Sequence, residues 1–206
     1  MKNTLKHWEL ALMIAVAVIL AGGLWIQEEQ SGLAGSMIRL HVIANSNSEE
    51  DQRLKLLVRD RVLESAQEIY ETCDTLEQAE QELKERLPML ESMGNELVRE
   101  MGYAYPVSAE LTQCWFPTKE YEEFSLPAGE YTAVRIVIGE GAGENWWCVA
   151  FPPLCVGAAS QSVEAVTQAG YFTKEQQRLM LQEENGYILK FKSMELFGEL
   201  WYGWTK

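Results

Sequence analysis

The sequence is poor in the residues from which most active sites and metal sites are built. Its 206 residues include two histidines, His7 and His41, and four cysteines without a CxxC pair. Zinc sites usually draw their ligands from such residues, so no metal centre is expected. The GxSxG, HExxH and Asp-Thr-Gly motifs of common hydrolases are also missing from the sequence. We therefore predict neither a catalytic set nor a cofactor.

Positive charge is scarce as well. The chain has 17 Lys and Arg against 31 Asp and Glu, which gives a formal net charge of −14 at pH 7. A surface of this sign repels a phosphate backbone, so we expect no nucleic-acid partner. The hydrophobic share of 47% is ordinary for a globular protein, and the length is sufficient for one domain with a real core.

One long hydrophobic run is present, near the N-terminus. Two lysines precede the apolar stretch from Leu10 to Leu24. This order is typical of a secretory signal, and the stretch is close to the shortest length that spans a membrane. A buried core helix is the alternative, but the stretch has no polar face. We predict a signal peptide or signal anchor in 1–26, a linker in 27–36 and a single extracytoplasmic domain in 37–206.

Export affects how the cysteines are interpreted, because an oxidising compartment permits disulfides. Cys148 and Cys155 flank the Pro152-Pro153 pair and could close a turn between them. The alternative is two buried free thiols on neighbouring strands. Four cysteines allow three full pairings, and spacing alone leaves this choice open.

The first half of the domain has one strand and two helices by its periodicity. Alternation predicts a strand over Met37–Ile43, and Ser48 is the expected N-cap of a helix of about twenty residues. Asp74–Glu77 resembles a capping box that starts a second helix, which continues towards Gly102. Pro88 is expected to kink this helix or to restart it.

The second half changes to the period of strands, over Val107–Cys114, Tyr131–Ile138 and Asn145–Phe151. Glycines in the turn Gly139–Gly143 favour a hairpin of the last two strands. We predict an α+β two-layer sandwich, with helices packed on one face of a mainly antiparallel sheet. The remaining expectations are a loop over Gly157–Gly170, a short helix over Lys174–Gln182, a strand over Tyr187–Lys192 and a final helix over Ser193–Tyr202.

Two long segments resemble the stage II sporulation protein R family. They are IRLHVIANSNSEEDQRLKLLVRD (Ile38–Asp60) and LPAGEYTAVRIVIGEGAGENWWCVAFPPLC (Leu126–Cys155), with a shorter match at Phe116-Pro117-Thr118. The resemblance implies a signalling protein of endospore-forming bacteria, exported from the forespore into the space between the two septal membranes. It also implies that the protein activates a membrane-embedded aspartic protease of the mother cell, which leads to processing of a sigma factor precursor. No small-molecule substrate is implied.

We expect the partner to contact an edge of loop polar residues and aromatic residues, because a fold alone rarely demands them. The predicted contact residues are Arg39, His41, Asn45, Asn47, Asp51, Gln52, Trp146, Trp147, Phe151 and Pro152. The alternative is that the Asn-Ser loop caps the helix and that the tryptophans fill the core. Strand alternation places Trp146 and Trp147 on opposite faces of the sheet.

Two functions from other classes remain open. One is a secreted hydrolase that uses His41 together with Asp51 or Glu49 as an acid–base pair. The other is an envelope structural protein held in place by the N-terminal segment. A lone strand histidine near a capping serine is more often structural, which favours the signalling interpretation over the hydrolase.

Overall fold

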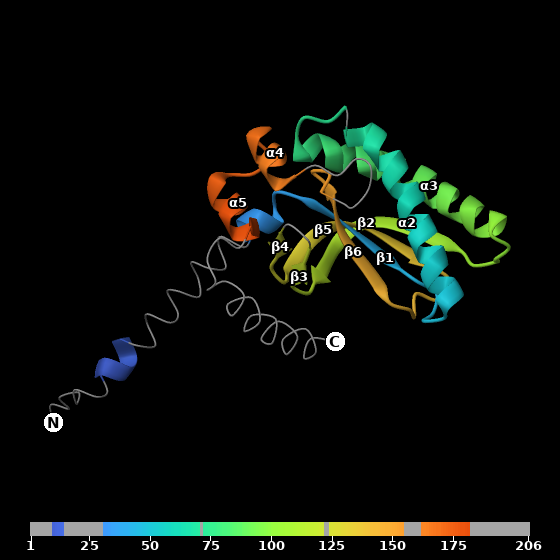
Figure 1. Cartoon of the computed structure of the whole chain (residues 1–206), viewed down its shortest axis with the longest axis horizontal. Coiled ribbons are helices and arrows are strands. Elements are labelled where there is room, and N and C mark those ends of the chain that lie inside the picture. The colour runs from blue at the N-terminus through green and yellow to red at the C-terminus, as the bar shows by residue number, and fades with distance from the viewer. Residues whose placement is uncertain (1–9, 15–30, 71, 122–123, 155–161, 182–206) are drawn as a thin grey trace, which may run out of the picture.

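A computed structural model describes residues 10–14, 31–70, 72–121, 124–154 and 162–181 of the chain (Figure 1). Of the predicted signal peptide or anchor, only residues 10–14 are described, as a short helical piece, and the rest of that prediction lies outside the described residues. In the described ranges, no helix has both the length and the apolar character needed to cross a membrane.

The described elements are one strand, two long helices, five strands and two short helices, in an order close to the prediction. They are β1 (Ile38–Ile43), α2 (Glu49–Tyr70), α3 (Leu76–Glu100), β2 (Val107–Phe116), β3 (Lys119–Glu120), β4 (Ser125–Leu126), β5 (Gly129–Ile138), β6 (Asn145–Phe151), α4 (Val163–Gln168) and α5 (Lys174–Leu181). The short β3–β4 ribbon and α4 are additions that the sequence pattern did not predict. The expected strand over Tyr187–Lys192 and the final helix lie outside the described residues.

The main sheet has the strand order β2-β5-β1-β6, which differs from the predicted hairpin. β5 and β6 are not neighbours, because β1 lies between them, parallel to β5 and antiparallel to β6. β2 pairs antiparallel with β5, so two of the three pairings are antiparallel, as expected for a mainly antiparallel sheet. Adjacent strands in sequence usually pair, but here the glycine-rich loop spans the width of one inserted strand.

The first long helix begins where its capping residue predicts, and the second begins one residue later than its predicted capping box. The Ser48 hydroxyl accepts the N–H of Asp51 in the first turn of α2. At α3, Thr75 accepts the N–H of Gln78, whose side-chain oxygen accepts the N–H of Asp74. The cap and its partner are thus Thr75 and Gln78, and not Asp74 and Glu77. The helix continues through Pro88 to Glu100, so the predicted restart does not occur.

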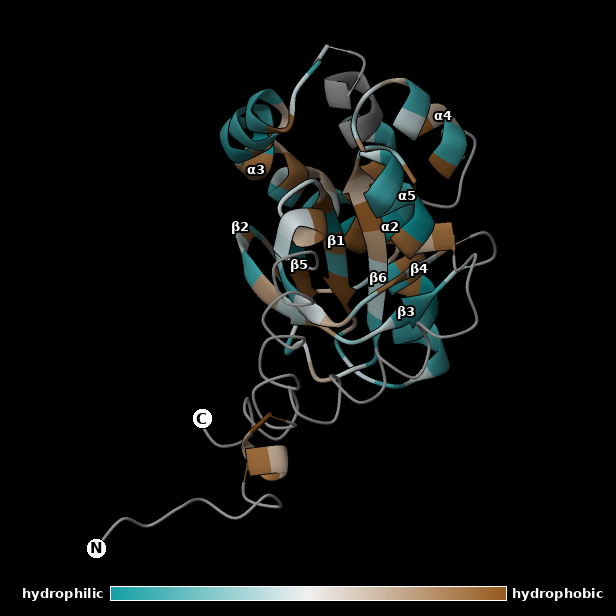
Figure 2. Ribbon diagram, turned by 90° about the vertical axis from the view of Figure 1, so that its left-hand side faces the viewer, coloured by the Kyte–Doolittle hydropathy of each residue, from teal (hydrophilic) through white to brown (hydrophobic). Residues whose placement is uncertain are grey.

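Alternation along the strands divides the apolar side chains between two cores. Leu40, Val134 and Ala150 face α2 and α3, where the helices supply their own apolar residues. In Figure 2 the outer side of α3 is hydrophilic and its hydrophobic residues lie towards the strands. Tyr131 and Val149 face the other way, into a second core.

This second core corrects the prediction that all helices pack on one face. Its residues outside the main sheet come from the segment before β1, from β4 and the adjacent Phe124, from Leu154 after β6, and from α4, α5 and the turn between them. Val163 and Val166 of α4 are fully buried there, although the sequence predicted a loop over Gly157–Gly170. Ser162 caps α4 by accepting the N–H of Ala165. Part of the stretch predicted as a loop is therefore a short capped helix.

Candidate functional site

The glycine-rich loop between β5 and β6 crosses the end of β1, and hydrogen bonds hold it there. The backbone N–H groups of Ala142 and Gly143 donate to the carbonyls of Asn45 and Ala44, at 3.1 and 2.9 Å. The Asn45 side-chain oxygen accepts the N–H of Glu140 at 3.0 Å. Asn45 therefore binds the loop through both its backbone and its side chain. These bonds hold the loop across the end of β1, so that β1 lies between the two strands that the loop joins.

Asp51 is the centre of the same network, at the first turn of α2. It is 3% exposed and accepts hydrogen bonds from the side chains of Asn45 (2.8 Å) and Ser46 (2.6 Å). Burial raises the pKa of this carboxyl, but the bonds from Ser46, Asn45 and Tyr105 outweigh that effect and lower the pKa below its usual value. Asp51 thus stays ionised and joins the loop to the helix N-terminus, which favours a negative charge.

Two further side chains from this segment bind the far end of the loop. The Asn47 side-chain oxygen accepts the N–H of Glu144 at 2.7 Å. The Lys55 ammonium donates to the Glu144 carbonyl at 3.0 Å and to the Gln52 side chain at 2.6 Å. Lys55 is 5% exposed, and burial lowers its pKa. Sequence reasoning missed Lys55, although its position one turn after Gln52 places both on one helix side.

His41 and Trp147 lie on the sheet face that is turned away from α2 and α3. Their rings stack with centroids 5.3 Å apart, and Phe116 lies beside both. The His41 Nε2 contacts the Asn145 side-chain oxygen at 2.7 Å. Burial lowers the pKa of His41 and outweighs the hydrogen bond with Asn145, which raises it. The imidazole is therefore held in its neutral form.

Arg39 is fully buried on the same face, two residues earlier in β1. Its guanidinium donates to the Cys148 carbonyl and to the Tyr121 hydroxyl, both at 2.8 Å. The cation also lies 4.3 Å from the centre of the Phe116 ring and 4.9 Å from that of Tyr131. Aromatic faces thus replace a carboxylate partner for this cation within the described part of the chain.

The remaining predicted contact residues lie along β6 and just after it. Trp146 faces the helices, where Arg59 lies over its ring at 4.3 Å, and Lys119 lies over Trp147 at 4.5 Å. The two tryptophans are therefore on opposite faces, as the alternation predicted. Phe151 and Pro152 are buried and are joined by a cis peptide bond.

The ten predicted contact residues do not form one exposed edge. Four of them lie at the end of β1 and the start of α2: Asn45, Asn47, Asp51 and Gln52. Arg39 and His41 lie instead on the sheet face that is turned away from α2 and α3. Phe151 and Pro152 lie at the other end of β6. The contacts of His41 are also separate from those of Asp51, so the acid–base pair of the hydrolase hypothesis is not assembled.

The free and bonded cysteines can be assigned in part. Cys148 is disulfide-bonded, while Cys73 and Cys114 carry free thiols. Burial raises the pKa of the Cys114 thiol, which makes it a weak nucleophile. Cys155, the predicted partner of Cys148, lies outside the described residues, so that pairing stays a prediction.

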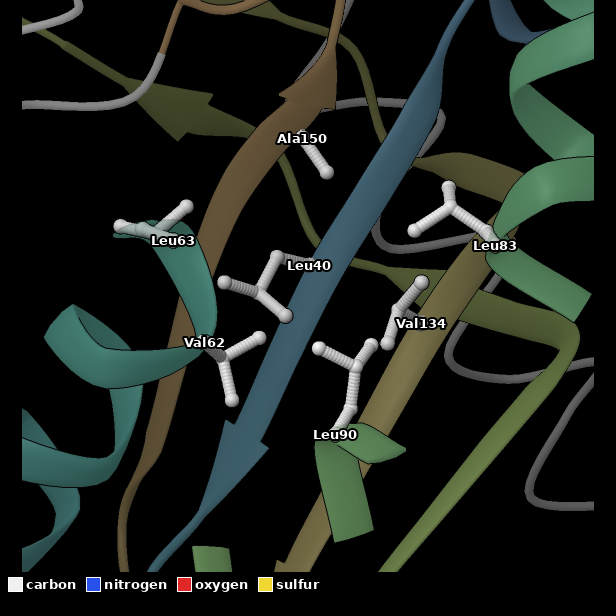
Figure 3. A pocket seen from close by; sticks show the side chains of 7 residues that line it. All are labelled: Leu40, Val62, Leu63, Leu83, Leu90, Val134 and Ala150. Carbon is white, nitrogen blue, oxygen red and sulfur yellow. The ribbon is translucent and has the colours of Figure 1, made fainter. Parts of the chain in front are cut away.

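A small cavity lies in the core between the sheet and the long helices (Figure 3). Seven apolar side chains point into it, from β1, α2, α3, β5 and β6: Leu40, Val62, Leu63, Leu83, Leu90, Val134 and Ala150. Its volume of about 10 Å³ is at the lower limit for one water molecule, and its lining offers no polar partner. This cavity is a packing defect and not a ligand site.

Comparison with known proteins places this architecture in a family. The family model for stage II sporulation protein R matches residues 34–161. Stage II sporulation protein R of Bacillus subtilis (strain 168) is 39% identical over 118 residues, which is 57% of this chain and 53% of the relative. The chain thus spans about half the length of this curated relative. No solved structure matches.

The family match includes every strand of the main sheet, both long helices and the loop that crosses β1. It also includes all ten predicted contact residues, from Arg39 to Pro152. The match ends before α4 and α5. The chain therefore belongs to the stage II sporulation protein R family and is a sporulation protein.

Proposed function

We propose that this protein is an exported sporulation signal that activates a septal membrane aspartic protease. The protease then processes the precursor of the mother-cell sigma factor. The protein acts from the space between the two forespore membranes, to which residues 1–26 direct it. Its own part is to bind, and the protease supplies the chemistry.

One observation carries this proposal: the family match covers the whole main sheet and its long helices. The residues that define the family therefore lie in the folded unit made by the main sheet and the two long helices. The resemblance of Ile38–Asp60 and Leu126–Cys155 to the family's two long signatures links the unit to activation of the protease.

The contacts of the polar residues support binding over catalysis. Asn45 and Asp51 hold the loop across β1, and His41 is stacked on Trp147 beside Asn145. Each of these groups already serves the fold. The accessible members of the predicted contact set are Asn47, which is exposed, and four half-buried residues, Asn45, Gln52, Trp146 and Trp147.

The test is co-expression with the protease and the sigma precursor in a bacterium that does not sporulate. We expect precursor cleavage when the full chain is exported, and none when residues 1–26 are deleted or when the protease is omitted. Export without cleavage would contradict the proposal.

The hydrolase and structural alternatives give different results in the same host. In a folded His41→Gln variant the amide replaces the imidazole beside Asn145, so signalling continues if His41 is structural. Loss of signalling in this folded variant would favour an acid–base role. An envelope structural protein would be required in amounts far above those of the protease, whereas an activator works at or below equal amounts.

A further inference from the structure

The edge strand β2 is protected along only part of its length. The Asn95 side chain donates to the Val107 carbonyl at 2.8 Å and accepts the Val107 N–H at 2.9 Å. The Glu91 carboxylate accepts the Ala109 N–H at 3.1 Å. Both side chains come from α3, which lies against β2. They occupy the outward N–H and carbonyl of Val107 and the outward N–H of Ala109, and such covering protects an edge from other chains.

The hydrogen bonds of β2 also show which of its backbone N–H and carbonyl groups point towards β5 and which point outward. Pro106 accepts the N–H of Gly139 from the β5 side, so even-numbered residues of β2 bond towards β5. Odd-numbered residues point outward, as the bonds of Val107 and Ala109 show. In an antiparallel strand the N–H and C=O of one residue point the same way. The next outward pairs therefore belong to Leu111 and Gln113.

The α3 side chains that bond to Val107 and Ala109 make no hydrogen bond to these two residues. Gln113 is exposed, and its side chain bonds to Thr132 of β5 at 2.8 Å, away from the free edge. Leu111 is half-buried on the side of the helices. Among the described residues, no side chain bonds to the backbone of either one. Figure 2 shows β2 at the border of the sheet, next to β5.

The opposite edge of the sheet differs, because an outward carbonyl of β6 already has a side-chain donor. The Tyr121 hydroxyl lies 3.2 Å from the Trp147 carbonyl. The open groups of β2 are thus the better template for an added strand.

We propose that the protease activated by this protein adds an extended segment to the edge of β2, at Leu111 and Gln113. This inference rests on the proposed function and names the surface that performs it. Backbone hydrogen bonds supply the affinity in such strand addition, and flanking side chains supply the specificity. Leu111 on one face and Cys114 on the other provide half-buried apolar neighbours for the added strand.

Charge argues for a neutral or basic segment from another protein and against a second copy of this chain. Two copies would each bring a net charge of −14, which opposes association. Glu110 beside the open edge is already paired with Arg135 at 2.8 Å, while Glu130 across from Trp115 is exposed. The added segment therefore has apolar residues at alternate positions and few acidic ones.

The test compares Gln113→Pro with Thr132→Ala. Both remove the side-chain bond between Gln113 and Thr132, but only proline removes the outward N–H of Gln113. Proline is tolerated on an edge where its missing N–H faces outward. We expect the alanine variant to activate the protease like the wild type, and the proline variant to lose at least tenfold in precursor cleavage at equal export and equal thermal stability.

Hydrogen exchange on the wild-type chain tests the same surface without a substitution, should the proline variant fold poorly. In the free protein the amides of Leu111 and Gln113 exchange quickly, while that of Thr112, bonded towards β5, exchanges slowly. On binding to the purified protease in detergent, the first two become protected and Thr112 changes little.

The outcomes separate this inference from the proposed function. If the wild type fails to trigger cleavage, the proposed function fails. If the wild type triggers cleavage but Gln113→Pro is equally active, or Leu111 and Gln113 stay unprotected in the complex, the inference fails alone. Protection already present in the free protein also overturns it. Dependence of that protection on concentration would indicate a second copy, and independence would indicate another segment of this chain.

Discussion

The Asn45 side-chain oxygen accepts the backbone N–H of Glu140 at 3.0 Å, although 95 positions separate the two residues. The same side chain donates to Asp51 at 2.8 Å. One amide thus connects the end of β1, the loop between β5 and β6, and the start of α2. This connection fixes the position of β1 between two strands that the sequence pattern pairs directly.

Asn45→Ala tests the importance of this connection. The substitution leaves the Glu140 N–H without its side-chain acceptor and removes one donor to the buried Asp51 carboxylate. We expect a loss of about 1–3 kcal/mol in the free energy of unfolding, measured by denaturant titration at pH 7. Asn47→Ala is the matched control, because it removes one bond at an exposed side chain and costs about 1 kcal/mol or less. Equal effects of the two substitutions would contradict the account.

Gly143 is expected to tolerate no side chain. A Cβ at this position would collide with the backbone carbonyl of Ser46, which the same network holds in place. Gly143→Ala should therefore lower the free energy of unfolding by about 2 kcal/mol or more. Gly32→Ala is the control, since nothing lies within 4 Å of the added methyl, and its effect should stay within about 0.5 kcal/mol. A neutral Gly143→Ala would show that the loop moves freely.

His41 gives the stability a dependence on pH. Burial, with help from the nearby Arg135 and Arg39, lowers its pKa in the folded protein below the usual value of 6.5. At pH above 6.5 the side chain is neutral in both states. As the pH falls below 6.5, the unfolded chain takes up the proton first, so folding stability decreases until the folded-state pKa is reached.

The measurement is the free energy of unfolding between pH 8 and pH 5, for the wild type and for His41→Gln. The variant cannot titrate, so its stability should decrease less over this interval. The contribution of Asp51 lies lower, because its lowered pKa affects stability only as the pH falls below 3.8. Identical pH profiles for the two proteins would rule out a buried neutral His41.

The cysteines should respond unequally to thiol reagents. In protein purified from an oxidising compartment and then unfolded without reductant, we expect labelling of Cys73 and Cys114 but not of Cys148. Peptide mapping should join Cys148 to Cys155, as the sequence predicts. Reduction of a loop this short should cost about 2–3 kcal/mol. Labelling of Cys148 without reductant would disprove the bond.

Local patterns predicted the elements of this fold better than their arrangement. Alternation placed Trp146 and Trp147 on opposite faces, and capping residues placed the starts of α2 and α3 to within one residue, because these signals act within a few residues. The order of the strands was beyond such signals. The glycine loop indicated a hairpin, and only the contacts of Asn45 with Glu140 and Ala142 show that β1 lies inside it.

The candidate site shows the same limit. The sequence identified His41, Asn45 and Asp51 as candidate contact residues. The same residue types stabilise a fold and bind a partner, so the sequence alone does not distinguish the two roles. Lys55 and Tyr121 were missed because their partners, Glu144 and Arg39, are distant in the chain. Their roles depend on strand order, which the pattern did not provide.

The central claim is that this protein is an activating ligand that acts from outside the cell that responds. The most direct measurement uses protoplasts that make the protease and the sigma precursor but not this protein. The purified full chain is added to their medium, and precursor cleavage is followed. The account predicts that precursor cleavage appears and saturates as the added chain reaches the amount of protease. No cleavage at any concentration of folded protein would contradict it.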